Sequence, residues 1–401
     1  MVSDYTVRTL RPDEHRAAAD LFRLTLHHVP ATDETWRRFT ERMLQPGRTL
    51  GAFDTELIGT ARSFDAEITL PGGARAGVAA VTGVGVRPDR TRRGILTELM
   101  RAQLTDIASR GLPFAALRAS EGVIYNRFGY GVTTRSRSYR IDRRRAVLRA
   151  DVPAAGQVEL WPLDTALERL PELYASLPHT RPGMMTRPPY WWPGWERHAR
   201  EATSPVVTAV HHGPNGPDGY VVYTVERKNW NDPAVLEVLS LHTATGEAFN
   251  GLWRYLLAVD LVDTLRAEER PVDEPAELLF TDLRAVQDTG GGDELWLRLV
   301  DVPAALGARE YAGEPVVLEV VDPALETNSG RYQVSPDGVR RTGAAADLRL
   351  GVDALAMIYL GAWRPSLLAA AGRIQPADPA VLERADRLFA TSVPAWCGTH
   401  F

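Results

Sequence analysis

The sequence of 401 residues contains a single cysteine, Cys397. One cysteine cannot form a disulfide within the chain, and it excludes metal sites built from several cysteines. No apolar run approaches the roughly 20 residues that are needed to cross a bilayer. The first residues, MVSDYTVRTLRPDEHR, are polar and acidic early, which does not fit a secretory signal peptide, so we expect a cytoplasmic protein.

A strong excess of one charge is also missing. The formal net charge is −5, from 46 basic and 51 acidic side chains. This mild balance argues against a nucleic-acid-binding protein and is compatible with a cationic substrate. Hydrophobic residues make up 44% and charged residues 24%, as in ordinary globular proteins, and the length predicts two to four domains.

The first 150 residues alternate patterns typical of strands and helices, which indicates a mixed α/β domain. Residues 94–111 carry apolar side chains on one helical face, and Gly111 favours a helix end. A second helix is predicted over residues 12–28, with Pro12 near its start. The predicted strands are 5–10, two or three strands within 49–70 around a turn at Asp54, a strand within 76–89 that ends in a loop, and 112–120.

The following segments repeat a similar order and then change. Strands over 219–228 and 234–245, a long helix over 246–268 and a strand over 276–282 echo residues 50–118, which suggests a second copy of one fold. The arginine-rich segment 135–149 is expected to be a solvated edge strand or linker, with a wall that faces a phosphate as the alternative. The last part predicts a linker at 289–293, then a compact α+β domain with a strand over 315–322, a hairpin over 331–342 and helices over 351–361 and 378–392.

Residues 84–100, VGVRPDRTRRGILTELM, place a strand end, an arginine-rich loop and a helix start in succession. The first N–H groups of a helix lack internal partners, and the helix dipole favours an anion there. Gly94 lets a phosphate approach the backbone closely, and Arg92 and Arg93 can add charge-assisted hydrogen bonds. We therefore expect a pyrophosphate site, with a plain surface loop as the alternative. The glycine-rich dinucleotide motif and the Gly-Lys-Ser/Thr of a P-loop are both missing.

A second motif, ASEGVIYNRFGYG at 119–131, follows the next predicted strand. Strand, anion-binding loop, helix, strand and tyrosine-bearing loop in this order resemble the GNAT family of acetyl-coenzyme A-dependent acetyltransferases. The family's Arg/Gln-x-x-Gly-x-Gly/Ala pattern is altered here, with Thr91 at its first position and Leu96 at its last. The resemblance implies these coenzyme-binding residues: Arg92, Arg93, Gly94, Ile95, Leu96 and Thr97 for the pyrophosphate, Val84, Gly85 and Val86 for the pantetheine arm, and Ser120 and Glu121 for the thioester end.

The layout of the whole chain is similar to that of the Eis (enhanced intracellular survival) family. ASEGVIYNRFGYG and PGMMTRPPYWW at 182–192 both look like segments of that family. The resemblance covers essentially all of the sequence and implies a mixed α/β, α+β architecture of two tandem GNAT-like domains, the second degenerate, followed by a domain that resembles sterol carrier proteins. We expect these domains at 1–150, 151–288 and 289–401. The family also implies a homo-hexamer built from trimers.

The reaction that the resemblance implies is direct acetyl transfer from acetyl-coenzyme A to an amine. An alkyl ammonium, with a pKa near about 10.4, must first lose a proton, and the departing thiolate must then gain one. Tyr125 is expected to be the general acid at the sulfur, because a phenol can donate a proton or hydrogen bond there. The carboxylate of Phe401 is expected to be the base or the group that holds a cationic amine. The alternatives are a packed Tyr125 that caps a loop and a frayed last residue.

The acceptor would contact aromatic side chains. His27, Trp36 and the pair Trp191–Trp192 are candidates, because aromatic rings can cover the faces of a polycation, although core packing or surface positions would explain them as well. Cys397 is expected to be a small buried residue, and we expect no metal.

These features predict an N-acetyltransferase of the Eis type that uses acetyl-coenzyme A as co-substrate. Its acceptor is expected to be a primary amine of an aminoglycoside-like polyamine, acetylated at several positions, which would make the protein an antibiotic-resistance enzyme. Three alternatives stay open at this point: acetylation of lysine in a peptide or protein, an acyl-coenzyme A-binding protein without activity, and a lipid carrier dominated by its C-terminal domain.

Overall fold

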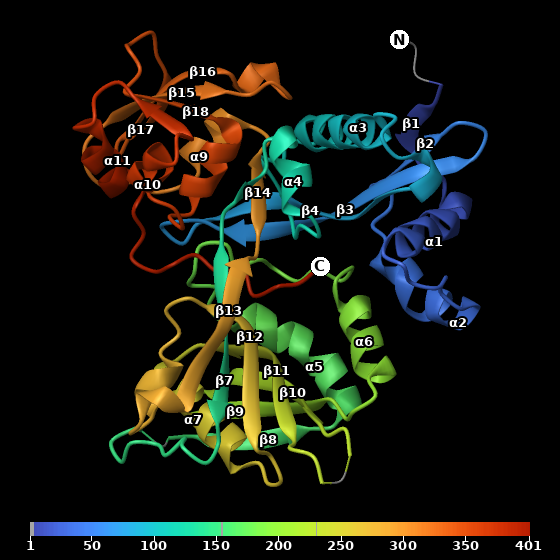
Figure 1. Ribbon diagram of the computed structural model, residues 1–401, viewed down its shortest axis with the longest axis vertical. Coiled ribbons are helices and arrows are strands. Elements are labelled where there is room, and N and C mark those ends of the chain that lie inside the picture. Colours follow the sequence, from blue (N-terminus) through green and yellow to red (C-terminus); the bar gives the residue numbers. More distant parts are fainter. Residues whose placement is uncertain (1–3, 154, 230) are drawn as a thin grey trace. The chain divides into compact units, whose positions relative to one another are not determined.

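The computed structural model describes residues 4–153, 155–229 and 231–401 (Figure 1). Their contacts divide the chain into two compact units. Unit 1 contains the described residues of Met1–Thr134 together with Thr180–Gly194 and Asp293–Phe401, and unit 2 contains those of Arg135–His179 and Trp195–Gly292. No helix within the described ranges is both long enough and apolar enough to span a membrane.

The first sheet of unit 1 holds seven strands in the order β1-β2-β3-β4-β5-β14-β6. Neighbours are antiparallel except β4 and β5, which run parallel. Its strands are β1 (Thr6–Thr9), β2 (Thr49–Phe53), β3 (Leu57–Thr69), β4 (Arg75–Val86), β5 (Phe114–Leu117), β6 (Gly131–Val132) and β14 (Trp296–Leu299). Its helical segments are η1 (Pro12–Glu14), α1 (His15–Thr25), α2 (Asp33–Thr35), η2 (Trp36–Thr40), η3 (Glu41–Met43), η4 (Pro88–Arg90), α3 (Ile95–Ser109), α4 (Gly122–Tyr125) and η5 (Asn126–Phe128).

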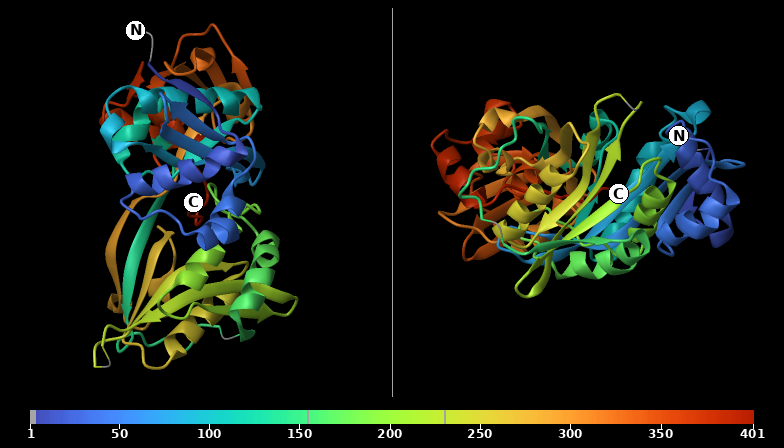
Figure 2. Two further views of the ribbon diagram at one scale, coloured as in Figure 1. Left: turned by 90° about the vertical axis from the view of Figure 1, so that its right-hand side faces the viewer. Right: turned by 90° about the horizontal axis from the view of Figure 1, so that it is seen from below.

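Helix α3 forms where the apolar spacing predicted it. Its buried side chains recur three and four residues apart, at Ile95, Leu99, Met100, Leu104 and Ile107, so that one stripe faces the sheet. Helix α1 lies on the other side of strands β3 and β4, as Figure 1 and the left view of Figure 2 both show. The central strands are therefore covered on both faces in the part of the sheet that carries the site.

Strands β4 and β5 stay together over only a short stretch. Pairing joins Val78–Ala80 to Phe114–Ala116, after which β4 continues to Val86 while β5 ends at Leu117. On its other side, β4 has an irregular register against β3 between Thr60 and Arg62. Such bulges bend a strand locally. The result is an opening between the two strands, and one backbone edge of β4 beyond Ala80 pairs with no other strand in the described part of the chain.

Strand β14 enters this sheet from a distant part of the chain. It pairs antiparallel with both β5 and β6, so a segment near residue 297 fills a place between residues 117 and 131. Side chains of the first sheet share one apolar core with the C-terminal part of unit 1. Phe64, Val78 and Phe114 belong to one cluster with Leu318, Leu355 and Leu388. The two parts of unit 1 are thus one packed body.

A five-stranded sheet forms the C-terminal part of unit 1, in the order β17-β16-β15-β18-β19. The predicted hairpin is present with its turn at the Pro-Asp-Gly segment. The elements are α8 (Val302–Gly307), β15 (Val316–Val321), η8 (Glu326–Asn328), β16 (Gly330–Ser335), β17 (Gly338–Arg341), β18 (Leu348–Gly351), α9 (Val352–Tyr359), α10 (Pro365–Ala370), β19 (Ile374–Pro376) and α11 (Val381–Phe389).

Unit 2 has its own seven-stranded sheet, in the order β13-β7-β12-β11-β10-β9-β8. Its apolar core includes Trp253 and Leu256 of α7 against Leu236 and Leu265 of the strands. The elements are β7 (Arg135–Asp142), β8 (Gln157–Trp161), α5 (Leu163–Ser176), β9 (Val207–Gly213), β10 (Gly216–Glu226), β11 (Val235–Thr243), α7 (Gly246–Ala258), β12 (Thr264–Pro271), η6 (Ala276–Leu279), η7 (Leu283–Ala285) and β13 (Val286–Asp293); α6 (Trp192–Glu201) begins in unit 1.

Four predictions of local structure were wrong. The helix predicted over 246–268 ends at Ala258, and the strand that follows it is β12 rather than 276–282, which holds the short helix η6. Residues 289–293 are no linker, because they belong to strand β13. Residues 135–142 form the inner strand β7, between β12 and β13, where Arg137 pairs with Glu277 on a neighbouring element.

Candidate functional site

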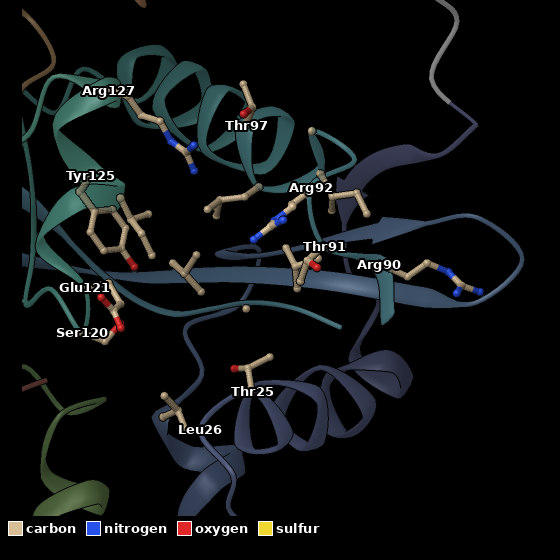
Figure 3. Close-up of a pocket in the computed structure, with 17 residues that line it drawn as sticks. Thr25, Leu26, Arg90, Thr91, Arg92, Thr97, Ser120, Glu121, Tyr125 and Arg127 are labelled. Carbon is tan, nitrogen blue, oxygen red and sulfur yellow. The ribbon is translucent and has the colours of Figure 1, made fainter. Parts of the chain in front are cut away.

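A pocket of about 520 Å³ lies in unit 1, at the opening between β4 and β5. It runs from the loop before α3 to the loop after β5, and Figure 3 shows Arg90 and Tyr125 at its two ends. Its lining residues are Thr25, Leu26, Val84, Gly85, Val86, Arg90, Thr91, Arg92, Gly94, Ile95, Leu96, Thr97, Ser120, Glu121, Ile124, Tyr125 and Arg127.

The start of α3 forms one end of this pocket. Gly94 is its N-cap residue with φ +82°, and Arg92 also has a positive φ of +61°. The first backbone bond of the helix is donated by Glu98 to the carbonyl of Gly94, so the N–H groups of Ile95, Leu96 and Thr97 lie before it. These groups and the positive end of the helix dipole favour an anion at this position.

The arginines of the loop differ in their surroundings. Arg92 and Arg127 make no hydrogen bond or ion pair to any described residue, and Figure 3 shows both side chains pointing into the pocket. Arg90 is paired with Asp54 and Asp89, at 3.4 and 2.8 Å. Arg93 is not among the lining residues, and its guanidinium lies 4.0 Å from Asp54. Two guanidinium groups that have no ion-pair partner among the described residues therefore face the pocket, and Arg93 does not carry one of them.

Tyr125 forms the other end. It is the last residue of α4 and is only 7% exposed. Its ring packs edge to face with the ring of Tyr130, with the ring centroids 6.1 Å apart. Burial raises the pKa of the Tyr125 phenol above its usual value. Its hydroxyl forms no hydrogen bond to the described residues. A protonated phenol at a pocket wall, without a hydrogen-bond partner among the described residues, has the chemistry of a proton donor.

Glycines hold the tyrosine loop in place. Gly129 has φ +82°, and a Cβ there would lie 2.7 Å from Val352 Cγ1 and 2.8 Å from Arg298 Nε. The N–H of Tyr130 donates to the carbonyl of Tyr125, which closes the turn after α4. On the other wall, a Cβ at Gly85 would lie 2.9 Å from Thr25 Oγ1, so the end of α1 packs directly on β4. Both walls of the pocket thus depend on missing side chains.

The last residues of the sequence also lie against the first sheet. The ring of Phe401 meets that of Phe64 on β3 edge to face, with centroids 5.7 Å apart. Trp191 donates its indole N–H to the carbonyl of His400 at 2.6 Å, and Arg187 donates to the carbonyl of Gly398 at 2.8 Å. Trp396, Cys397 and Thr399 are buried. Phe401 is therefore packed rather than frayed.

Known protein families match the chain in three segments. Residues 6–133 and residues 183–299 each match an acetyltransferase (GNAT) domain family, and residues 302–398 match a sterol carrier protein domain family. The crystal structure of Eis1 from Mycobacterium abscessus superposes with a TM-score of 0.91 at 40% identity, over 99% of this chain and all of that one. N-acetyltransferase Eis of Mycobacterium tuberculosis is 36% identical over 86% of each chain. This chain belongs to the Eis family of N-acetyltransferases.

The chain is also similar to a protein from another genus. An uncharacterized N-acetyltransferase of Streptomyces coelicolor is 38% identical to this chain over 92% of both. The predicted architecture, two GNAT domains followed by a sterol-carrier-protein-like domain, is confirmed. The chain is thus an N-acetyltransferase, as the resemblance implied.

The residues expected at the acceptor lie outside the pocket lining. His27 is exposed just after α1 with φ +60°. Trp36 starts η2, and the guanidinium of Arg16 lies 5.3 Å from the centre of its ring. Trp192 stands edge to face with Trp191 and donates its indole N–H to the carbonyl of Arg187. Trp192 is thereby joined to the segment that holds the last residues of this Eis-family chain.

Sequence reasoning missed several residues of the pocket. The sequence could have indicated Arg127, because it lies two residues after Tyr125 in the motif already singled out. No pattern in the sequence indicated Thr25 and Leu26, since they reach the pocket only through the packing of α1 on β4. The other lining residues that were not predicted are Arg90, Thr91 and Ile124. Among the described residues, no group of three or more His, Cys, Asp or Glu side chains is arranged to hold a metal ion.

Proposed function

We propose that this Eis-family enzyme transfers the acetyl group of acetyl-coenzyme A directly to a primary amine of an aminoglycoside-like polyamine. One observation carries the proposal: a single pocket joins the N-terminus of α3 and two guanidinium groups, unpaired among the described residues, to the buried phenol of Tyr125. Such a pocket suits a ligand with a pyrophosphate at one end and a thioester at the other.

The residues at the start of α3 would bind the pyrophosphate. The N–H groups of Ile95, Leu96 and Thr97 supply donors, and Arg92 and Arg127 supply charge. The unpaired edge of β4 at Val84–Val86 offers backbone groups to the amides of the pantetheine arm. Ser120 and Glu121, after β5, line the pocket beside Tyr125 and would contact the thioester end through their backbone.

The proposed chemistry moves protons on both sides of the thioester. The ammonium loses one proton, its nitrogen forms a bond to the thioester carbonyl carbon and gives up a second proton to solvent, and the bond from that carbon to sulfur breaks. Tyr125 donates its proton to the departing sulfur and regains one from solvent; burial raises the pKa of its phenol, so the group is protonated at neutral pH. The carboxylate of Phe401 receives the ammonium proton through water or holds the cationic amine near the carbonyl.

The acceptor class follows from charge and aromatic surface. The net charge of −5 and the carboxylate of Phe401 favour a cation, and Trp36, Trp191 and Trp192 are the aromatic residues that we propose to contact a sugar. The trimer-based hexamer, the cytoplasmic location and the domain limits 1–150, 151–288 and 289–401 remain predictions. Mass measurement in solution tests the first of these.

Release of free thiol from acetyl-coenzyme A tests the function. We expect release that depends on kanamycin as a polyamine probe and is saturable, with a mass gain of one or more acetyl groups on kanamycin. A lysine-containing peptide and buffer alone serve as comparison. Faster thiol release with the peptide would indicate that the acceptor is a protein and not a polyamine. If neither compound caused thiol release, the result would favour a coenzyme-binding protein without this activity.

A further inference from the structure

Glu294 is a buried carboxylate that joins three parts of unit 1. Glu294 lies in the chain between β13 and β14. The whole residue is 2% exposed, and its side chain is fully buried. The hydroxyl of Thr134 donates to Oε2 at 2.9 Å, and Nη1 of Arg118 lies 3.6 Å from Oε1. Burying a charge costs free energy unless several donors surround it, so the carboxylate of Glu294 depends on its hydrogen-bond donors.

Two of these donors belong to the last residues of the sequence. The N–H of Cys397 donates to Oε2 at 3.1 Å, and the N–H of Gly398 donates to Oε1 at 2.8 Å. Both oxygens of one carboxylate are therefore committed to consecutive peptide groups. Burial raises the pKa of the Glu294 carboxyl, and the N–H groups of Cys397 and Gly398 counteract this shift. The tail is thus fixed three to four residues before Phe401.

The same carboxylate contacts a residue that is close in sequence to the pocket lining. Arg118 follows the last residue of β5 and comes two residues before Ser120, which lines the pocket. Strand β14, which begins two residues after Glu294, pairs with β5 at Trp296 and Leu117. Glu294 therefore stands between the segment that leads to Tyr125 and the segment that leads to Phe401.

We propose that Glu294 is a positioning residue for acetyl transfer, which holds the backbone of Cys397 and Gly398 and so places the carboxylate of Phe401 relative to Tyr125. Glu294 acts through the tail and does not touch the substrates. The inference rests on the proposed function, because it gives the placed carboxylate its part in the reaction.

The substitution Glu294→Gln tests this role without changing side-chain volume. Because each oxygen accepts from a backbone N–H, the amide must direct its NH₂ group at one of these two donors in either orientation. Glu274→Gln is the matched control: this glutamate is also buried and also accepts hydrogen bonds, from Arg270 and Tyr139 in unit 2. Thermal unfolding identifies the variants that are folded.

Carboxypeptidase A, followed by mass spectrometry, measures the placement of the tail independently of activity. We expect faster release of Phe401 from Glu294→Gln than from wild type and from Glu274→Gln. We also expect kcat to fall by about 10- to 100-fold in Glu294→Gln, with a nearly unchanged Kd for coenzyme A, because a small misplacement of a reacting group costs that much. Unchanged release, or faster release with unchanged kcat, overturns the proposal.

A glycine appended after Phe401 provides the coupling test. If Glu294 acts through the carboxylate of Phe401, the variant that combines Glu294→Gln with this glycine should have about the same kcat as the slower single variant. If the two losses in kcat instead multiply, the two changes act independently, which would overturn the proposal. Glu294→Asp, which keeps the charge but is too short to reach both N–H groups, replaces Glu294→Gln if that protein does not fold. A wild type without amine-dependent thiol release would refute the proposed function itself, whatever the release of Phe401.

Discussion

Phe401 and Phe64 pack edge to face, which joins the last residue of the sequence to a central strand of the first sheet. Phe64 is 5% exposed and belongs to the core that the two parts of unit 1 share. The position of Phe401 thus depends on the sheet. It also depends on Trp191, Arg187 and Glu294, which form hydrogen bonds with the backbone of His400 and Gly398.

Replacing Phe64 by alanine removes the ring that supports Phe401. We expect a loss of about 3–5 kcal/mol of stability, as for other buried phenylalanines, and a lower kcat. Phe280→Ala, the same change at a buried ring of unit 2, should reduce stability similarly but leave kcat unchanged. Denaturant unfolding and steady-state kinetics measure both. Equal kcat in the two variants would mean that the ring contact does not serve catalysis.

Tyr125→Phe should lower kcat by about 100- to 10,000-fold, the range for loss of a general acid, while coenzyme binding stays nearly constant. Stability should also stay constant, since the hydroxyl has no hydrogen-bond partner among the described residues. Tyr130→Phe is the control. Its hydroxyl is buried without a partner in the described structure, so its removal should be neutral or stabilising and leave kcat unchanged.

The ionisation of Tyr125 should be visible in a spectroscopic titration. Burial raises its pKa above the usual 10.0, so the phenol remains a proton donor below pH 10 and loses this ability only as the pH rises through the raised value. Any stability linked to this shift is likewise present below pH 10 and lost above it. The tyrosinate absorbance of wild type minus that of Tyr125→Phe should show a midpoint above pH 10. A midpoint below 10 would contradict the buried environment.

Coenzyme affinity should distinguish the arginines around the pocket. Arg92→Ala and Arg127→Ala should each weaken coenzyme A binding by about tenfold or more, the loss of one charged hydrogen bond, and the effect should shrink at high salt. Arg93→Ala should change the dissociation constant far less, because this guanidinium faces Asp54. Isothermal titration calorimetry provides the constants. A larger effect at Arg93 would support its predicted role in binding the pyrophosphate.

Gly129→Ala should destabilise the protein much more than Gly111→Ala. Both glycines have a positive φ, which costs about 1–2 kcal/mol with a side chain. A Cβ at 129 also meets Val352 and the buried Arg298, which is held by Asp322, whereas nothing lies within 4 Å of a Cβ at 111. Overpacking adds about 1–3 kcal/mol. Urea unfolding that gives equal losses would show that the loop can move away.

Local patterns predicted the elements that local chemistry determines. The apolar stripe with Leu99, Met100 and Leu104 predicted α3, and the helix begins directly after Gly94, as the sequence predicted. The pocket gathers every predicted coenzyme-binding residue except Arg93, although their binding roles stay predictions.

What the sequence could not predict depends on contacts between distant residues. The place of β14 between β5 and β6 is set by core packing, and no periodicity near Trp296 indicates it. Glycines at 290–292 disfavour a strand locally, yet β13 pairs them into a sheet. The role of Glu294 was invisible for the same reason, since its partners Arg118 and Gly398 are more than 100 residues away.

The late entry of β14 has a consequence for biosynthesis. Until residues 296–299 have been synthesised and have left the ribosome, strand β14 cannot form. The apolar strand β5, Phe114–Leu117, then lacks its antiparallel neighbour and has an open edge. An open apolar edge invites pairing with other chains, and contacts this far apart in sequence form slowly. A nascent or truncated chain that stops before Trp296 should therefore depend on chaperones and aggregate without them, so the first domain can mature only after most of the polypeptide has been made.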